Sequence, residues 1–126
     1  MKTELQKHLQ TIAPSISIRT IWEPDQDRID IRQDCDGFED EDPEDWQAWQ
    51  SEVRATAIIN GEEVSCSDYL GGTWERAGED PATSNPTISG YEPDMTQEAL
   101  RELLAFAPSL EVEISAAIKY IKSLNP

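Results

Sequence analysis

The chain has 126 residues, 37% hydrophobic and 29% charged, and its 26 Asp and Glu against 10 Lys and Arg give a formal net charge of −16. This length suits one domain with a modest core, whereas the negative charge opposes binding to nucleic-acid backbones and to anionic lipids. The absence of an apolar run of about 18 residues, of a signal-like N-terminus and of more than two cysteines favours a cytoplasmic protein without a membrane span.

The first third of the chain predicts a short helix and two strands. Thr3 and Gln6 have the spacing of a capping box, and residues 3–12 place their apolar side chains on one face. Residues 15–22 alternate between apolar and polar side chains, and residues 28–34 do the same, as half-buried strands do. Because only a polar turn separates these two runs, we expect them to pair antiparallel.

The middle of the chain predicts a β-hairpin. Residues 51–59 have strand character, and the Asn60-Gly61 pair that follows is a strong signal for a type I′ turn. Residues 62–74 then form the returning strand, which we expect to be broken or bulged at Gly71-Gly72.

Two helices are predicted at the end of the chain, after an aperiodic segment. The first is expected to begin near Asp94 or Thr96 and to end at Ala107, and the second is expected to begin after a Ser109 cap. The apolar stripe of the second helix would cover the sheet.

These elements predict one α+β domain over residues 1–126. It has about four strands in a mainly antiparallel sheet, a short N-terminal helix and two C-terminal helices. An acidic insert at 34–45 and a long irregular loop at 76–94 interrupt the regular structure.

The acidic insert is the strongest signal for function. It contains eight carboxylates, and no Lys or Arg lies between Arg32 and Arg54. The eight acidic residues are Asp34, Asp36, Glu39, Asp40, Glu41, Asp42, Glu44 and Asp45. Because like charges at this density repel one another, the insert is either a well-solvated loop or a surface for a cationic partner.

Three aromatic residues near the insert are candidates for anchoring such a partner. Trp46 and Trp49 follow the acidic residues directly, on a helical turn that Asp42 or Asp45 is expected to cap, and Tyr69 precedes the diglycine. Aromatic side chains contribute strongly at interfaces, although burial in the core is the alternative for each of these three.

Metal, cofactor and catalytic motifs are missing from the sequence. Neither Asp34 nor Asp40 begins a run with the Gly and Glu positions of a calcium-binding loop, and one histidine with two distant cysteines does not suit zinc. His8 is the only histidine available as a catalytic base, and no phosphate-binding glycine pattern is present. We therefore expect no cofactor, no metal site and no enzymatic activity.

Part of the chain resembles a family of proteins. The stretch Gly61–Trp74, with its Tyr-Leu-Gly-Gly-x-Trp core, and the preceding Asp40–Trp46 look like small acidic proteins of phages and prophages that have no assigned activity. The composition is also similar to that of phage-encoded DNA mimics. The resemblance implies a host cytoplasm and a target such as a restriction or CRISPR effector, and it assigns no functional residue.

The favoured hypothesis is DNA mimicry. Carboxylates about 6.8 Å apart on a strand, or about 6 Å apart on a helix, approximate a row of phosphates. We therefore expect a monomer or homodimer that inhibits a basic nucleic-acid-binding protein, without binding nucleic acid or membrane itself. An accessory or regulatory module of a phage nucleic-acid machine, an assembly protein, and an enzyme of unfamiliar type remain as alternatives.

Overall fold

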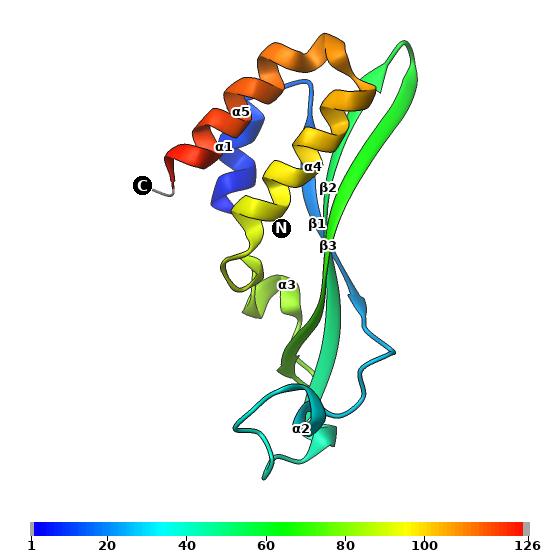
Figure 1. Ribbon diagram of the computed structural model, residues 1–126, viewed down its shortest axis with the longest axis vertical. Helices are drawn as coiled ribbons and strands as arrows, with labels where there is room; N and C mark the ends of the chain where they lie inside the picture. Colours follow the sequence, from blue (N-terminus) through cyan, green and yellow to red (C-terminus); the bar gives the residue numbers. More distant parts are fainter. Residues whose placement is uncertain (1, 125–126) are drawn as a thin grey trace.

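The computed structural model of the protein describes residues 2–124 and has an α+β fold (Figure 1). A three-stranded antiparallel sheet is combined with helices from both ends of the chain, so the predicted fold class is confirmed. The elements, in which η denotes a 3₁₀ helix, are α1 (Glu4–Ile12), β1 (Ser17–Pro24), α2 (Ile31–Asp34), η1 (Pro43–Asp45), β2 (Trp46–Ile59), β3 (Glu62–Arg76), α3 (Pro81–Ser84), η2 (Ile88–Gly90), α4 (Glu92–Phe106), η3 (Pro108–Leu110) and α5 (Glu111–Ser123).

The sheet has the order β1-β2-β3, with the long strand β2 in its centre. The predicted hairpin between β2 and β3 is confirmed. Asn60 and Gly61 connect the two strands, and their φ angles of 52° and 83° are the positive values that a type I′ turn requires.

The predicted irregularity at the diglycine is also confirmed, and it is a bulge. The pairing of β2 with β3 shifts by one residue between Trp49 and Ser51, so that Gly71 and Gly72 stand opposite the single residue Gln50. Gly72 has a φ of 70°, which glycine adopts without strain. A bulge of this kind bends the strand locally and changes the direction of nearby side chains.

The strand predicted over residues 28–34 is wrong. Regular structure there is limited to the four-residue helix α2, so the sheet has three strands instead of about four. Asp30 is the N-cap of α2, and its Oδ1 atom accepts a hydrogen bond from the Arg32 amide at 3.0 Å. Ile29 is 81% exposed whereas Ile31 is fully buried, which excludes the shared face that alternate residues of a strand would have.

The helical turn predicted to carry two tryptophans is wrong as well. Asp42 does cap a turn, but this turn is the 3₁₀ helix η1, which ends at Asp45. Trp46 and Trp49 both lie on strand β2. Three-residue spacing fits a helix and also an irregular strand, so the spacing did not decide between them.

Helix starts were predicted with mixed success. At α1 the capping box is present, because the Gln6 amide donates to Thr3 Oγ1 and the Thr3 amide donates to Gln6 Oε1. At α5 the predicted Ser109 cap is wrong. Ser109 lies inside η3, and α5 begins at Glu111 without a side-chain cap, because the 3₁₀ turn already directs the chain into the helix.

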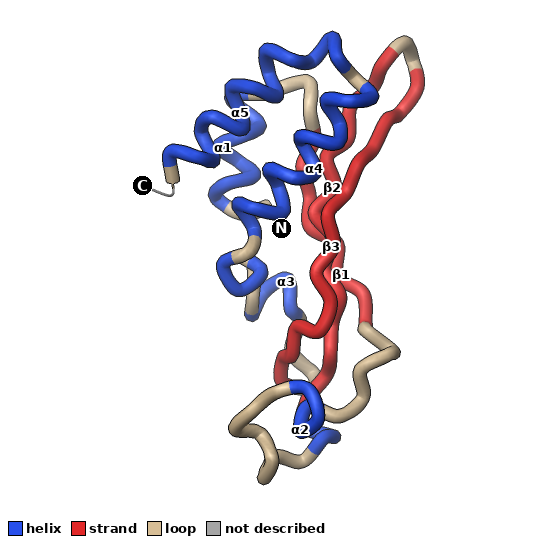
Figure 2. Tube along the Cα trace, viewed as in Figure 1, coloured by secondary structure: helices blue, strands red, loops and turns tan. Residues whose placement is uncertain are grey.

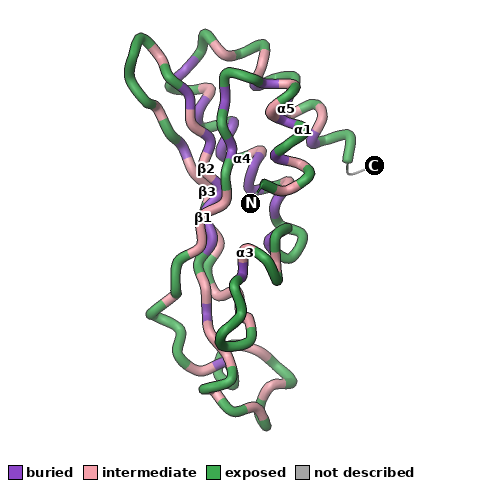
Figure 3. The backbone as a smooth tube through the Cα atoms, turned by 180° about the vertical axis from the view of Figure 1, so that it is seen from behind, coloured by how far each residue is buried: buried purple, intermediate pink, exposed green. Residues whose placement is uncertain are grey.

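The main core lies between the sheet and the helices. Helix α4 packs against β2 and β3, and α5 packs on α4 and α1, all on one side of the sheet (Figures 1 and 2). Seen from behind in Figure 3, buried residues concentrate between these layers, whereas the hairpin tip and the opposite end of the molecule are more exposed. The largest side chains of this core include Leu9, Ile16, Leu100, Leu103, Ile114 and Ile121.

One carboxyl group is buried at the edge of this core. Glu92, the first residue of α4, is 3% exposed, and its Oε2 atom has no hydrogen-bond partner among the described residues. Burial raises the pKa of this carboxyl above its ordinary value of 4.5, and a hydrogen bond from Thr3 offsets only part of the effect. Because the folded chain then holds this proton more tightly than the unfolded chain, stability falls as the pH rises above 4.5.

Replacing Glu92 with glutamine is expected to raise the free energy of unfolding at pH 7 by about 1–3 kcal/mol, because it removes a desolvated charge. The gain should shrink below pH 4.5, where the wild-type carboxyl is protonated. Urea unfolding at pH 4 and pH 7 measures both values, with Glu102→Gln on the exposed side of the same helix as the control. An equal gain at the two pH values would contradict this origin.

Candidate partner-binding surface

The acidic insert folds into a small lobe at one end of the molecule. We call residues 31–45 the acidic lobe; it contains α2 and η1 and lies at the end of the sheet opposite the hairpin tip (Figure 1). Turns hold it together, because the Cys35 amide donates to the Ile31 carbonyl at 3.0 Å and the Asp45 amide donates to the Asp42 carbonyl at 3.0 Å. The lobe also contacts the end of β3, where the Ala77 amide donates to the Asp45 carbonyl.

The lobe presents its charge to solvent. Seven of the eight predicted acidic residues are exposed, and only Glu41 is half-buried. Asp34 is the one member of the eight that forms an ion pair with another described residue, at 3.1 Å from Arg28. Within residues 2–124, no three Asp, Glu, His or Cys side chains are grouped so that they could hold a metal ion. The carboxylates are therefore spread over a surface instead of converging on one point.

An ion-pair network connects the lobe to the bulge of β3. The Arg28 guanidinium bridges Asp34 at 3.1 Å and Asp25 at 3.4 Å, and Asp25 in turn accepts a hydrogen bond from the Gly72 amide at 3.1 Å. The hydrogen bond and the charge of Asp34 raise the pKa of Arg28, so the guanidinium stays protonated throughout the ordinary pH range. The diglycine thus provides the room and the donor that this network needs.

Replacing Gly72 with alanine is expected to lower the free energy of unfolding by about 1–3 kcal/mol, since its φ is positive and a Cβ atom would lie 3.0 Å from the Arg28 Cζ and Nε atoms. Arg28 would have to move by a few tenths of an ångström, which strains its ion pairs with Asp25 and Asp34. Gly78→Ala is the matched control, because Gly78 also has a positive φ but no atom within 4 Å of the added Cβ. Equal losses in urea unfolding of the two variants would show that backbone strain alone acts.

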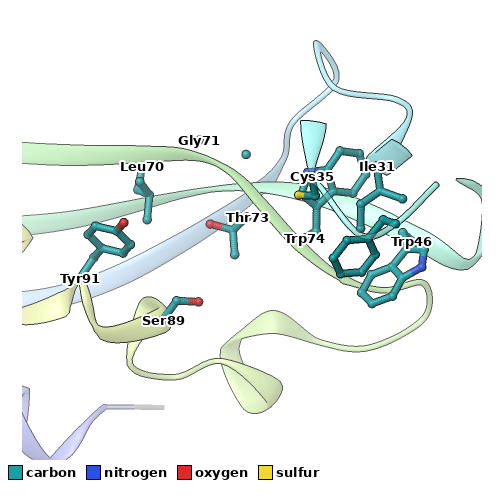
Figure 4. A pocket seen from close by; sticks show the side chains of 11 residues that line it. Ile31, Cys35, Trp46, Leu70, Gly71, Thr73, Trp74, Ser89 and Tyr91 are labelled. Atoms are coloured by element: carbon teal, nitrogen blue, oxygen red, sulfur yellow. The ribbon is translucent and has the colours of Figure 1, made fainter. Parts of the chain in front are cut away.

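A groove lies between the acidic lobe and the core. We call it the aromatic groove; its volume is about 380 Å³. It is lined by Ile31, Cys35 and Phe38 of the lobe, Trp46 of β2, residues 70–74 of β3, and Ser89 and Tyr91. Figure 4 shows Trp46, Trp74, Ile31 and Cys35 at one end of the groove, Leu70 and Tyr91 at the other, and Thr73 between them.

Aromatic contacts organise the lobe end of this groove. The rings of Phe38 and Trp46 meet edge to face, with centroids 5.3 Å apart, and the Arg76 guanidinium lies 4.4 Å from the centroid of the Trp46 ring. The indole N–H groups of Trp46 and Trp74 are buried and have no acceptor among the described residues. These donors are unusual, because buried polar groups are nearly always paired.

The structure places the three predicted aromatic anchors differently. Trp46 lines the aromatic groove beside the acidic residues. Trp49 is half-buried, does not line the groove, and its indole N–H has no acceptor among the described residues. Tyr69 is 58% exposed and stands opposite Glu52 on the sheet, away from the groove lining. Sequence reasoning missed Phe38, Trp74 and Tyr91, of which Trp74 belongs to the Tyr-Leu-Gly-Gly-x-Trp core.

A polar network lies on the face of the sheet that the helices leave uncovered. Glu52 Oε2 accepts hydrogen bonds from Arg54 Nε at 2.7 Å and from the Ser67 hydroxyl at 2.6 Å. Burial raises the pKa of Glu52, but these two hydrogen bonds and the Arg54 charge bring it below its ordinary value. Tyr69 borders this network, so the uncovered face combines charged and aromatic side chains.

Comparison with protein families, with curated proteins and with solved structures finds no match to this chain. Over residues 2–124, no helix combines the length and the apolar character needed to cross a bilayer. The site is therefore interpreted from its own geometry and charge.

Proposed function

We propose that this chain is an acidic, phage-derived binding protein that inhibits a nucleic-acid-binding protein of the host, of the restriction or CRISPR type, by occupying its basic groove. The observation that carries the proposal is the acidic lobe, in which seven exposed acidic residues extend from one end of the molecule and one of the eight is neutralised by an ion pair. A protein that binds nucleic acid through Lys and Arg would be attracted to this lobe by the same electrostatics.

The acidic lobe would imitate the density of negative charge on a nucleic acid more than the regular spacing of its phosphates. The eight acidic residues lie mostly on turns, and only Asp34, Glu44 and Asp45 belong to the short helices α2 and η1. A row of carboxylates at strand or helix intervals is therefore not available from secondary structure. Concentrated charge on a protruding lobe still competes with phosphates, because a basic groove responds to potential at the range of about 10 Å set by salt screening.

An accessory or assembly module is the second candidate. The uncovered face of the sheet favours it, because Tyr69 is exposed there opposite Glu52 of the polar network, and Ile58 is exposed further along β2 towards the hairpin tip. Exposed aromatic and apolar side chains on an uncovered sheet face provide area for contact with another protein. Binding through this face would leave the acidic lobe free and would not compete with nucleic acid.

A competition assay separates the two candidates. The immobilised chain is first used to capture proteins from host lysate, and a salt gradient identifies the one that elutes last. That protein is then loaded with a fluorescent DNA or RNA duplex and titrated with the free chain. Release of the duplex, weakening as the salt concentration rises, is expected from mimicry. A ternary complex that retains the duplex would instead support the accessory module.

A further inference from the structure

The aromatic groove has the shape and lining of a binding site. Its volume of about 380 Å³ lies in the range of small-ligand sites, about 300–1,000 Å³. Rings of Phe38, Trp46, Trp74 and Tyr91 contribute to its wall, from segments that are distant in the sequence. Tyr91 is 54% exposed at the end away from the lobe, so the groove opens to solvent (Figure 4).

The charge around the groove favours a cationic occupant. The lobe contributes Ile31, Cys35 and Phe38 to its wall, and seven of the eight acidic residues of the lobe are exposed, so the potential at this end is negative although no carboxylate lines the groove itself. None of the lining residues is Lys or Arg. Of the two guanidinium groups near the lining, Arg28 is paired with two aspartates and Arg76 lies over the Trp46 ring. A phosphorylated ligand would be repelled here by the charge of the lobe, whereas a cation is attracted by that charge and can also interact with the aromatic rings of the wall.

Among cationic side chains, the groove suits arginine better than lysine. A guanidinium is planar, weakly hydrated and stacks on aromatic rings, whereas an ammonium group is strongly hydrated and enters apolar surroundings reluctantly. The protein already uses this chemistry once, since the Arg76 guanidinium lies over the Trp46 ring. The hydroxyl groups of Thr73 and Ser89 also line the groove and can accept hydrogen bonds from guanidinium N–H groups.

We propose that the aromatic groove receives an arginine side chain of the basic partner, while the acidic lobe beside it attracts the surrounding positive charge. This proposal rests on the proposed function, because a nucleic-acid-binding groove supplies arginines. It adds a specific recognition element to an interaction that charge alone would leave nonselective. Arginine is also among the residues that dominate binding energy at protein interfaces.

Titration with blocked single amino acids tests the groove without a partner protein. Acetyl-arginine-methylamide is added to the labelled chain, and the lysine and neutral citrulline counterparts are added to parallel samples. The arginine probe is expected to shift the amide signals of Gly72 and Thr73 and the indole signals of Trp46 and Trp74 saturably, with an affinity about fivefold or more above both counterparts. Equal affinity for lysine, or shifts confined to the acidic residues of the lobe with none at Gly72, Thr73, Trp46 or Trp74, would overturn the proposal.

Variants at the rim provide a second measurement. Tyr91→Ala and Phe38→Leu are expected to weaken binding of the arginine probe about fivefold. Phe106→Ala is the matched control, because Phe106 is 69% exposed on α4 and does not line the groove. Unchanged affinity in both rim variants, with their folding confirmed by circular dichroism, would refute arginine binding in the groove.

The arginine titration and the competition assay test separate claims, so that either claim can be refuted without the other. Arginine binding without displacement of nucleic acid would support the groove and remove the mimicry. Displacement of nucleic acid that persists in the Tyr91→Ala and Phe38→Leu variants would support the mimicry through the lobe and remove the groove from it.

Discussion

Replacing Ile31 with alanine is expected to release the acidic lobe while leaving the main core folded. Ile31 is fully buried although it lies in the lobe, and it does not belong to the apolar cluster between sheet and helices. Truncating a buried isoleucine lowers the free energy of unfolding by about 2–5 kcal/mol. Because Ile31 lies in the wall of the aromatic groove, we expect this loss to weaken the packing of the lobe against the rest of the molecule. The amides of Cys35, Asp45 and Ala77, whose hydrogen bonds close the lobe, should then exchange with solvent about 30-fold faster or more.

Ile29→Ala is the control for this prediction. Ile29 is two residues away and 81% exposed, so its truncation should change the exchange of the same amides little. Amides of the central strand, such as that of Val53, should keep their protection in both variants. If Val53 exchanged faster in step with Cys35 after Ile31→Ala, the lobe and the core would form one cooperative unit and the prediction would be wrong.

Ile29 and Ile31 also show why the sequence did not predict the fold of this segment. Signals that act within a few residues were sufficient elsewhere, as the capping box of Thr3 and Gln6 and the Asn60-Gly61 turn demonstrate. The alternation of apolar and polar residues over 28–34 was a local signal too. It leads to a strand only where a neighbouring strand is available for pairing, and this segment has no such neighbour among the described residues. The structure of this segment is determined by the burial of Ile31 against the rest of the protein and not by the local alternation.

The sequence predicted the acidic residues of the candidate site but not the aromatic groove. Composition identified the acidic residues, because charge density in a short segment is visible without a fold. The aromatic groove was not predicted, since Phe38, Trp74 and Tyr91 come to line the same groove only after the hairpin and the segment following β3 are in place. The Tyr-Leu-Gly-Gly-x-Trp sequence marked one wall of the groove, but nothing local indicated what would face it.

Reversing four carboxylates of the lobe is expected to slow association with the basic partner about 10-fold or more at 0.1 M salt, with a smaller change in dissociation. The variant combines Asp36→Lys, Asp40→Lys, Glu44→Lys and Asp45→Lys, four side chains that form no ion pair or side-chain hydrogen bond with described residues. Folding should therefore change little, since exposed charges contribute little to stability. Stopped-flow mixing with the captured partner measures the association rate.

The matched control reverses four glutamates near the hairpin tip and the adjoining helix ends, namely Glu62, Glu63, Glu102 and Glu111. Each reversal adds two positive charges, so both variants move the net charge from −16 to −8 and differ only in where the change lies. Because screening limits each charge to about 10 Å at 0.1 M salt, a contact surface at the lobe predicts a large effect in the first variant and a small one in the control. Equal slowing in both would mean that the partner responds to total charge, and the lobe would then have no privileged role.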